Sequence, residues 1–476
     1  MSARYAILNR EWMLRGWADT PPLLANWKTG DQRELKKAGF YVAESCNGRM
    51  DFDSLAFLPR HRALLDRLIE EGIAEECRAG ASLEGWQVYR KAPNPRLTGI
   101  HWCVTGFCNL NCRHCYMEAP SGRYGELPLH GMARLIEQFE RANVIEVSLT
   151  GGEPFVRKDL LEIIRMLAGK KIHLSQIYTN GLLVTDEHLR DIAAIGYQPA
   201  FQVSFDGVGA HDSMRGVAGV EGSVVAAIRR LRAAGFPVAV ATSIDSCNLG
   251  SLAGTYGLMK TLDIQSWRVS SPQETGNWRG ATTAASLDEQ ASACLPLLQR
   301  WLGDGKPFAI QLGGFFRGGS GRERPSGSRP HRVSPKRGAR PGVPDAPAFT
   351  PDAYDCGACR EQPNLLPDGT LVPCPGYVDS VLQDRMPNLL RGELATVWTD
   401  SFLRQIADIK KRDLLGAIPE CAACDLFREC GTGCRAFALT ATGTLMAKDP
   451  AACEMCQKGY RQRFREAVAL QESGFG

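Results

Sequence analysis

The sequence predicts an α/β fold with parallel strands, and two observations support this prediction. Six apolar runs between residues 99 and 270 have the length of buried strands, and most of them are followed by a helical pattern. Strands that alternate with helices pair in parallel, and six such units make a parallel barrel or partial barrel, whose active site lies at the carboxyl ends of the strands. The predicted strands are residues 99–104, 144–149, 174–178, 200–205, 238–244 and 267–270.

Two of the connecting segments have the spacing of an amphipathic helix. Residues 159–167 repeat apolar side chains every three or four positions and stop before Gly169. Residues 223–234 do the same before Gly235. Because a glycine directly after such a pattern is a frequent helix end, both segments are predicted helices.

Three cysteines directly after the first predicted strand form the most informative motif of the chain. Cys108, Cys112 and Cys115 follow the pattern C-x3-C-x2-C. Three thiolates can hold three irons of a four-iron cluster and leave the fourth iron open to a substrate, whereas a cluster that only carries electrons usually has four cysteine ligands. A zinc site or a buried cysteine cluster is the alternative for these residues.

A glycine-rich segment, Gly151-Gly152-Glu153-Pro154, follows the second predicted strand. The triad and this segment together resemble the radical SAM superfamily. The resemblance implies a partial barrel of six units in which S-adenosylmethionine (SAM) binds the open iron of a 4Fe-4S cluster and is cleaved by one electron to a 5'-deoxyadenosyl radical. It also implies that Gly151 and Gly152 let the backbone approach the methionine end of SAM, and that Glu153 holds its ammonium group.

The same resemblance implies further SAM contacts at the ends of the next strands. Ser204 closes the fourth predicted strand and is the better candidate for contact with the ribose and carboxylate of SAM. Asn180 and Asp206 are weaker candidates, because Asn-Gly and Asp-Gly are also common turn sequences. Either His114 or Tyr116 is expected near the adenine, and an ordinary loop position is the alternative for the histidine.

Eight cysteines near the C-terminus are regularly spaced: Cys359-x9-Gly369-x4-Cys374 is followed by Cys421-x2-Cys424-x5-Cys430-x3-Cys434, with Cys356 before and Cys453 after them. This spacing resembles the SPASM extension of radical SAM enzymes, which binds two auxiliary 4Fe-4S clusters. Spacing alone would group neighbouring cysteines differently from the way in which the resemblance groups them. Two structural zinc ions are the alternative occupants. Cys456 could replace Cys453 as the last ligand. By position, the resemblance assigns Cys356, Cys359, Cys374 and Cys434 to the first cluster, and Cys421, Cys424, Cys430 and Cys453 to the second. The other five cysteines are predicted to be buried: Cys46, Cys77, Cys103, Cys247 and Cys294.

The first 95 residues have a different order of elements. Strand-like residues 5–8 and 23–27 precede a helical stretch at 33–46, an amphipathic helix at 61–71 and a short strand that begins at 72–74. This order resembles the small winged-helix module, similar to the pyrroloquinoline-quinone biosynthesis chaperone (PqqD-like), that binds leader peptides. A peptide can join an exposed strand of such a module as an extra strand. A cap that only stabilises the barrel is the alternative.

The predicted domains are a leader-recognition module at 1–95, a radical SAM barrel at 96–312, a basic linker at 313–350 and a SPASM domain at 351–476. Between residues 315 and 341 there are eight basic residues and one acid, so this segment carries +7 and the remainder carries −3 of the net +4. The charge therefore does not indicate a nucleic-acid-binding surface. A solvated linker is expected, with an electrostatic arm or a frame-shifted stretch as alternatives.

The chain has 17 cysteines but no charged-then-apolar leader, which favours a reduced cytoplasm over a disulfide-forming compartment. No apolar run reaches the roughly eighteen residues that a membrane span needs, so no membrane association is expected.

These features predict a radical SAM maturase of a ribosomally made precursor peptide, which binds through its leader. A reductant such as a flavodoxin or ferredoxin would supply electrons, and an auxiliary cluster would accept the second electron. The expected product is a crosslink, with a thioether from cysteine to carbon favoured over a carbon–carbon bond. The alternatives are a haem-modifying enzyme, a sulfatase maturase, against which Pro375 after Cys374 counts, and a non-catalytic electron carrier. No general acid or base is predicted.

Overall fold

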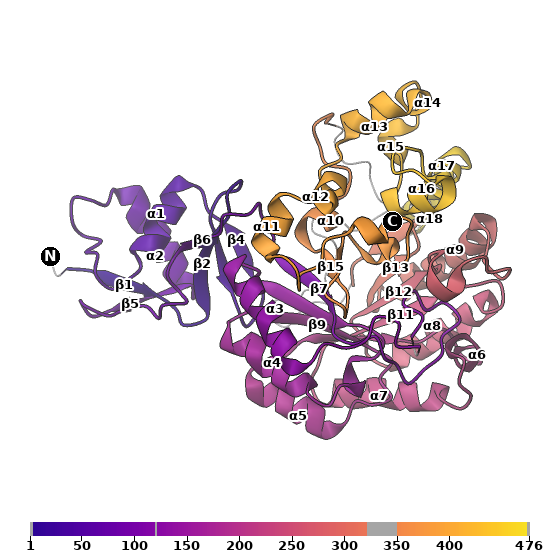
Figure 1. Cartoon of the computed structure of the whole chain (residues 1–476), viewed down its shortest axis with the longest axis horizontal. Coiled ribbons are helices and arrows are strands. Elements are labelled where there is room, and N and C mark those ends of the chain that lie inside the picture. Colours follow the sequence, from indigo (N-terminus) through magenta and orange to yellow (C-terminus); the bar gives the residue numbers. More distant parts are fainter. Residues whose placement is uncertain (1–2, 120, 321–349, 474–476) are drawn as a thin grey trace.

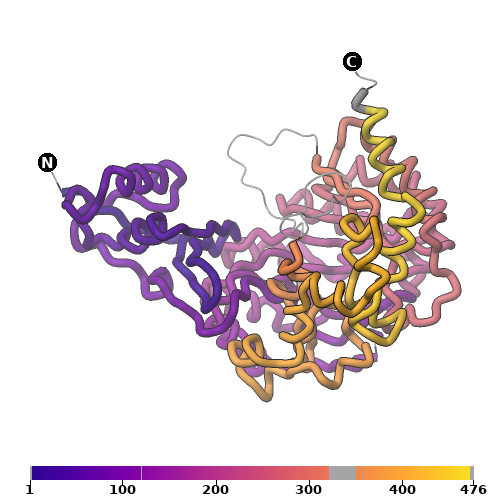
Figure 2. Tube along the Cα trace, turned by 90° about the horizontal axis from the view of Figure 1, so that it is seen from above, coloured from indigo at the N-terminus to yellow at the C-terminus, as the bar shows by residue number. Residues whose placement is uncertain are grey.

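The computed structural model describes residues 3–119, 121–320 and 350–473. Three parts follow one another along the chain: N-terminal strands with two helices at one end, a central α/β body, and a set of short helices that lies over this body (Figure 1). Seen from above, the last helix runs along the side of the molecule away from the N-terminal part (Figure 2).

The six predicted strands all form, and they pair in parallel within one ten-stranded sheet. They follow one another across the sheet in chain order, which is the arrangement that repeated strand-helix units produce. The predicted parallel α/β class is therefore confirmed. The strands are β7 (Gly99–Cys103), β8 (Glu146–Thr150), β9 (His173–Thr179), β10 (Ala200–Ser204), β11 (Val238–Ser243) and β12 (Ser266–Ser270).

Two further strands extend the sheet beyond β12. β13 (Ala309–Leu312) pairs in parallel with β12, and β14 (Phe316–Gly318) pairs antiparallel with β13. The predicted linker boundary at residue 313 is therefore wrong, because the hydrogen bonds of β14 make residues 316–318 part of the sheet. The rest of the predicted linker, residues 321–349, lies outside the described residues.

The cysteine-rich part also contributes to the central sheet, at its opposite edge. β15 (Asn364–Leu365) pairs in parallel with β7, so that Asn364 lies opposite His101. β16 (Leu371–Val372) then pairs antiparallel with β15. The first strand of the barrel is thus covered by a strand from the predicted SPASM segment.

Side chains alternate between the two faces of the sheet and give the faces different character. In β10, Phe201 and Val203 are fully buried under the helices, while Gln202 and Ser204 stay partly accessible on the inner face. We call the space that the inner face lines the lumen. Both predicted helices form, as α4 (Leu160–Gly169) and α7 (Glu221–Ala233). The covering helices are α3 (Leu129–Arg141), α4 (Leu160–Gly169), α5 (Asp186–Ile195), α7 (Glu221–Ala233), α8 (Leu252–Thr261) and α9 (Leu287–Gly303).

The N-terminal part contains a two-stranded and a four-stranded sheet. The predicted helix at 33–46 begins only at Lys37, because Arg33 pairs with Leu24 in a strand. The strand at Trp12–Gly16 was not predicted. The elements are β1 (Tyr5–Leu8), β2 (Trp12–Gly16), β3 (Leu23–Asn26), β4 (Gln32–Glu34), α1 (Lys37–Ser45), α2 (Pro59–Glu70), β5 (Ala74–Cys77) and β6 (Arg90–Lys91).

The four-stranded sheet joins the N-terminal part to the barrel. Met13 and Ala25 on one face belong to the large core of the barrel, whereas Leu14 on the other face belongs to a smaller core with α1 and α2. Trp17 Nε1 donates to the carbonyl of Ala142 at the end of α3, at 3.1 Å. Apolar packing and this hydrogen bond together attach the sheet to the barrel.

Helices, most of them short, make up about half of residues 350–473. In the part of the chain that the structure describes, no helix has both the length and the apolar character to cross a bilayer. The helices are α10 (Gly357–Glu361), α11 (Leu394–Thr399), α12 (Phe402–Ala407), α13 (Lys411–Ala417), α14 (Pro419–Ala422), α15 (Phe427–Cys430), α16 (Arg435–Thr442), α17 (Pro450–Gln457) and α18 (Tyr460–Ser473).

Candidate functional site

The three cysteines of the first motif lie together in the loop after β7. The structure places their thiols close enough to interact: burial raises the pKa of Cys108 to about 12, and the neighbouring Cys112 and Cys115 add to this shift. Other elements hold the loop, since the carbonyl of Cys115 accepts from the amide of Asn277 at 3.0 Å. Three gathered thiols at the carboxyl end of a barrel strand fit a four-iron cluster with one open iron.

The two glycines of the second motif let the end of β8 lie directly against the cysteine loop. A Cβ on Gly151, whose φ is +142°, would come within 2.5 Å of Thr105 O, and one on Gly152 within 2.1 Å of Phe107 O. Instead, the amide of Gly152 donates to Thr105 O and that of Glu153 to Phe107 O, each at 2.9 Å. Only glycine permits this approach, whether or not the same backbone also contacts SAM.

Glu153 is completely buried and connects the ends of β8 and β9. Its carboxylate accepts from Thr179 Oγ1 at 2.8 Å and from the amides of Asn180 at 2.7 Å and Phe155 at 3.1 Å. Burial raises its pKa to about 7, and the three hydrogen bonds oppose this shift. These donors already engage both carboxylate oxygens, so the structure gives Glu153 a positioning role; its contact with the SAM ammonium stays a prediction.

The other predicted SAM residues surround the same region. Asn180 Nδ2 donates to Asn109 Oδ1 of the cysteine loop at 2.7 Å, which joins the end of β9 to the motif. Ser204 lies at the end of β10 on the lumen face. The Tyr116 hydroxyl lies 3.6 Å from Cys103 Sγ, against β7. Their contacts with SAM stay predictions.

A buried ion pair beside the triad was missed in the sequence. Asp206 is fully buried, and its Oδ2 lies 2.7 Å from Arg215 Nε. Arg215 Nη1 in turn donates to Cys112 Sγ at 3.5 Å. Arg215 ends the short helix α6 (His211–Arg215), and its carbonyl accepts from the amide of Asn111 at 3.2 Å. Asp206 therefore positions Arg215, which contacts a cysteine of the triad. This role adds to the turn or the SAM contact that the sequence suggests for Asp206.

Unsatisfied polar groups beside the triad fit a polar ligand such as SAM. His114 Nδ1 is buried and has no hydrogen-bond partner among the residues that the structure describes. Within the same residues, Asp245 Oδ2, after β11, is likewise buried without a hydrogen bond, although Arg113 Nη1 lies 3.5 Å away. Asp245 and Arg113 line a hollow next to the cysteine loop. Buried polar atoms normally have partners, so a ligand that supplies donors and acceptors fits this region.

The four cysteines assigned to the first auxiliary cluster come together around Tyr377. Hydrogen bonds with Cys356 and Cys374, together with burial, raise the pKa of Cys359 well above its usual value. Burial raises the pKa of Cys434 to about 11, and the nearby Cys374 and Cys356 thiols add to the shift. Burial raises the pKa of the Tyr377 hydroxyl, and the charges of all four cysteine side chains raise it further. The structure therefore brings Cys434 to this group.

An ion pair next to two of these cysteines explains why Cys434 lies beside Cys356, which is far from it in the sequence. Asp355 precedes Cys356, and Arg435 follows Cys434; Arg435 Nε lies 3.2 Å from Asp355 Oδ2, and both side chains are almost fully buried. The pair therefore fixes the start of α16 beside α10. Lys411 also forms an ion pair with Asp355.

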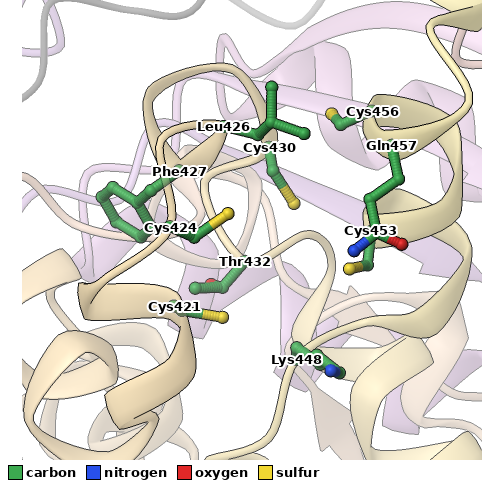
Figure 3. A pocket seen from close by; sticks show the side chains of 10 residues that line it. All are labelled: Cys421, Cys424, Leu426, Phe427, Cys430, Thr432, Lys448, Cys453, Cys456 and Gln457. Carbon is green, nitrogen blue, oxygen red and sulfur yellow. The ribbon is translucent and has the colours of Figure 1, made fainter.

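The cysteines assigned to the second auxiliary cluster line one hollow (Figure 3). They come from α14, α15, α17 and the connection between α14 and α15. Cys456 lines the same hollow and hydrogen-bonds with Cys430, so it stays an alternative to Cys453. The five cysteines around the hollow are Cys421, Cys424, Cys430, Cys453 and Cys456.

Within residues 3–119, 121–320 and 350–473, no three His, Cys, Asp or Glu side chains converge closely enough to hold one metal ion. The ligands of a four-iron cluster each bind a different iron, so they stand further apart than those of a single ion. Of the other five cysteines, Cys247 is exposed and Cys77 is partly exposed, so their predicted burial is wrong or incomplete.

Double variants test the division of the C-terminal cysteines into two groups. We expect Cys434→Ala with Cys359→Ala to lose about four irons per chain, because both thiols serve one cluster. Cys434→Ala with Cys430→Ala should lose about eight, because it removes a ligand from each cluster. Iron and sulfide analysis of anaerobically reconstituted protein measures the difference, and Cys77→Ala is the control. Equal losses in the two double variants would contradict this division.

Comparison with known proteins supports a radical SAM domain around the first cysteine motif. Residues 102–245 match the model of the Radical SAM superfamily. AdoMet-dependent heme synthase of Oleidesulfovibrio alaskensis is 28% identical over 373 residues, which cover 75% of this chain and 87% of the relative. Mycofactocin maturase MftC of Mycobacterium tuberculosis is 28% identical over 349 residues, which cover 71% of this chain and 78% of the relative.

A solved structure extends the comparison to the N-terminal part. Streptococcus suis SuiB bound to precursor peptide SuiA shares the fold with a TM-score of 0.63 at 14% identity. The match covers 94% of this chain and 100% of that chain. Such coverage means that the shared fold extends to most of the first 95 residues as well as to the barrel and the cysteine-rich part.

Proposed function

This chain contains a radical SAM domain over residues 102–245, and from that premise we propose that it is a radical SAM maturase of a ribosomally made precursor peptide. The observation that carries the proposal is the sorting of its cysteines into a triad at the barrel mouth and two further groups beyond it. The triad alone would hold the cluster that forms the radical. The two further groups would hold clusters that accept the electron released when an oxidative step forms a bond.

The proposed chemistry is a crosslink in the peptide, with a thioether from cysteine to carbon favoured. When bound, the cluster of the triad and SAM supply a 5'-deoxyadenosyl radical, with one electron from a reductant such as a flavodoxin or ferredoxin. The carbon loses a hydrogen atom to the 5'-deoxyadenosyl radical, which becomes 5'-deoxyadenosine, and the thiol loses a proton as the C–S bond forms. An oxidised iron–sulfur cluster held by the C-terminal cysteines would accept the remaining electron. The peptide thus loses two hydrogens for each bond.

The protein's own residues provide the geometry for this reaction. Glu153 and the two glycines before it fix the end of β8 against the cysteine loop, and Arg215 holds Cys112. Gln202 and Ser204 on the inner face of β10 stay partly accessible beside them, while the opposite face of the strand is buried. We assign SAM to the region bounded by Ser204 and His114.

We propose that the N-terminal part recognises the leader of the peptide. β4 is an edge strand of the four-stranded sheet, and its residues Arg33 and Glu34 are exposed. A leader can pair with such an edge through backbone hydrogen bonds. The shared fold with SuiB, a protein solved with its precursor peptide, supports this role and a PqqD-like identity for the part. We also propose a cytoplasmic setting.

A second candidate is a haem-forming or haem-modifying reaction. The identity to AdoMet-dependent heme synthases extends over 75% of this chain, which favours it. Such an enzyme needs no leader-binding part, so leader affinity distinguishes the two candidates. An electron carrier, the non-catalytic alternative, would bind clusters without cleaving SAM.

The decisive experiment uses anaerobically reconstituted full chain, SAM, a reductant and the short peptide encoded beside the gene. Mass spectrometry before and after thiol alkylation should show a loss of two hydrogens per event and one fewer alkylatable cysteine. The same mass loss with all thiols free would replace the thioether by a carbon–carbon bond. If deoxyadenosine is released but the peptide stays unchanged and does not bind, the proposal that the substrate is a peptide would be refuted. The same peptide without its leader is the control.

A further inference from the structure

Three polar side chains form a row across the last strands of the barrel, on the lumen face. Arg268 of β12 lies opposite Gln311 of β13, and Gln311 lies opposite Arg317 of β14. The residues that flank Arg268 and Gln311 are buried in the core on the other face of the sheet: Trp267, Val269, Ile310 and Leu312. Strand alternation therefore directs the row into the lumen.

Among the described residues, no carboxylate neutralises the two arginines of the row. Arg317 Nη2 donates to Gln311 Oε1 at 3.2 Å, but its Nη1 is buried and finds no hydrogen-bond partner in residues 3–119, 121–320 and 350–473. Burial lowers the pKa of Arg317, and the charge of Arg268 lowers it further. Arg268 is exposed on the lumen face. Among the residues described, neither arginine forms an ion pair with an aspartate or glutamate.

This arrangement is costly unless a ligand completes it. Two like charges on β12 and β14, separated by β13 alone, repel, and a buried guanidinium N–H without an acceptor loses the hydrogen bonds it makes in water. Elsewhere the described residues supply acceptors to buried arginines: Arg215 pairs with Asp206, Arg435 pairs with Asp355, and Arg15 donates to the backbone carbonyls of Leu14, Trp86 and Val88. The open guanidinium N–H of Arg317, beside a second arginine, therefore indicates a site for an external anion.

The row also lies beside the predicted reaction centre. Ser204 of β10 pairs with Ala241 of β11, and Ala241 pairs with Arg268, so Ser204 and Arg268 stand two strands apart. This places their Cα atoms about 10 Å from each other. Across the lumen, burial raises the pKa of Tyr178, and the charge of Arg268 opposes this shift, so the guanidinium also reaches β9.

We propose that Arg268 and Arg317, with Gln311 between them, bind a carboxylate of the substrate within the lumen. The planar guanidinium presents paired N–H groups that match the two oxygens of a carboxylate, and Gln311 is held beside them as a further donor. The carboxylate belongs either to the C-terminus of a peptide or to an Asp or Glu side chain. That it belongs to a peptide rests on the proposed function; the carboxylate site itself does not.

The first arm of the test needs no peptide. Phenylglyoxal labels accessible arginines of the reconstituted full chain, and mass spectrometry follows each site in the presence of N-acetylglycinate or its neutral amide. At ten times its Kd, the carboxylate should slow labelling of Arg268 and Arg317 about tenfold. The amide should have no effect. Arg165, exposed on the outer face of α4, is the control that neither compound protects.

The second arm compares the peptide encoded beside the gene with versions that lack one carboxylate. One version is amidated at the C-terminus, and the others carry Asn for Asp or Gln for Glu at single positions. Removal of the recognised carboxylate should weaken binding to the wild-type chain about 10- to 100-fold. Arg268→Gln and Arg317→Gln should weaken binding of the unmodified peptide similarly and abolish the difference between versions. Arg165→Gln should bind like wild type.

The outcomes separate this inference from the proposed function. Protection in the first arm without any peptide binding would keep the carboxylate site and refute the peptide substrate. Peptide binding that no carboxylate and neither lumen arginine affects, together with no protection, would overturn the inference and leave the proposed function intact. The version of the peptide that loses affinity identifies the source of the carboxylate.

Discussion

Replacement of one triad cysteine should abolish SAM cleavage. In Cys115→Ala the loop keeps two thiols, which cannot hold a four-iron cluster in the manner of three, and the cluster supplies the electron that cleaves SAM. We expect 5'-deoxyadenosine release below detection, and about four fewer irons per chain than wild type. Chromatography of an anaerobic reaction with SAM and a reductant measures the first quantity, and iron analysis measures the second.

Two controls make the result specific. Cys77→Ala removes a partly exposed thiol of the N-terminal part and should leave both quantities unchanged. The double variant Cys434→Ala with Cys430→Ala should lose the auxiliary irons but still release deoxyadenosine, because the triad is intact. Deoxyadenosine release by Cys115→Ala at the wild-type rate would remove the basis for assigning SAM chemistry to this loop.

Replacement of Asp206 by asparagine should destabilise the chain strongly. The Asp206 side chain is fully buried, and Arg215 Nε lies 2.7 Å from its carboxylate, so Asp206→Asn leaves a buried guanidinium without its counter-charge. Loss of one partner from such a pair costs about 3–5 kcal/mol. Asparagine keeps an oxygen for the amide of Ser243, which now donates to Asp206 Oδ1 at 2.9 Å. The effect therefore reports the charge and not the hydrogen bond.

Thermal and urea unfolding under reducing conditions measure the loss. Asp186→Asn is the matched control, because Asp186 is exposed and lies 3.6 Å from Arg230; we expect a change of about 1 kcal/mol or less. If both variants unfold at the same midpoint, Asp206 and Arg215 do not form the ion pair that holds α6 against the cysteine loop.

Most of the barrel was predictable from the sequence because its strands are long and apolar. β9 and β11 are buried runs that stand out from their surroundings. The strands that were missed are short or polar: β14 has three residues with Arg317 at its centre, and β15 has two. Such strands form only because a neighbouring edge is already present, and a local pattern cannot show that.

The candidate site was predictable where its residues are close in sequence. The spacing of Cys108, Cys112 and Cys115 identified the triad directly. Arg215 was missed because its importance arises from contacts with Asp206 and Cys112, which come from different strand ends. A charged residue in a short helix directly after an Asp-Gly strand end was the available signal.

The distribution of the eight C-terminal cysteines came from family resemblance and not from spacing. Cys430 and Cys434 are near neighbours in sequence, yet the structure directs them into different groups. The ion pair between Arg435 and Asp355 that draws Cys434 to the first group joins residues far apart in the chain. Long-range contacts of this kind have no local signature.

The pairing of β15 with β7 has a consequence for synthesis of the protein. β7 is the first barrel strand to leave the ribosome, but the strand that covers its edge is made only after β14. Until then the backbone groups at the edge of β7 remain open to other chains. We expect the nascent chain to be prone to aggregation through this interval, and a barrel truncated before residue 364 to need a chaperone that the full-length chain does not.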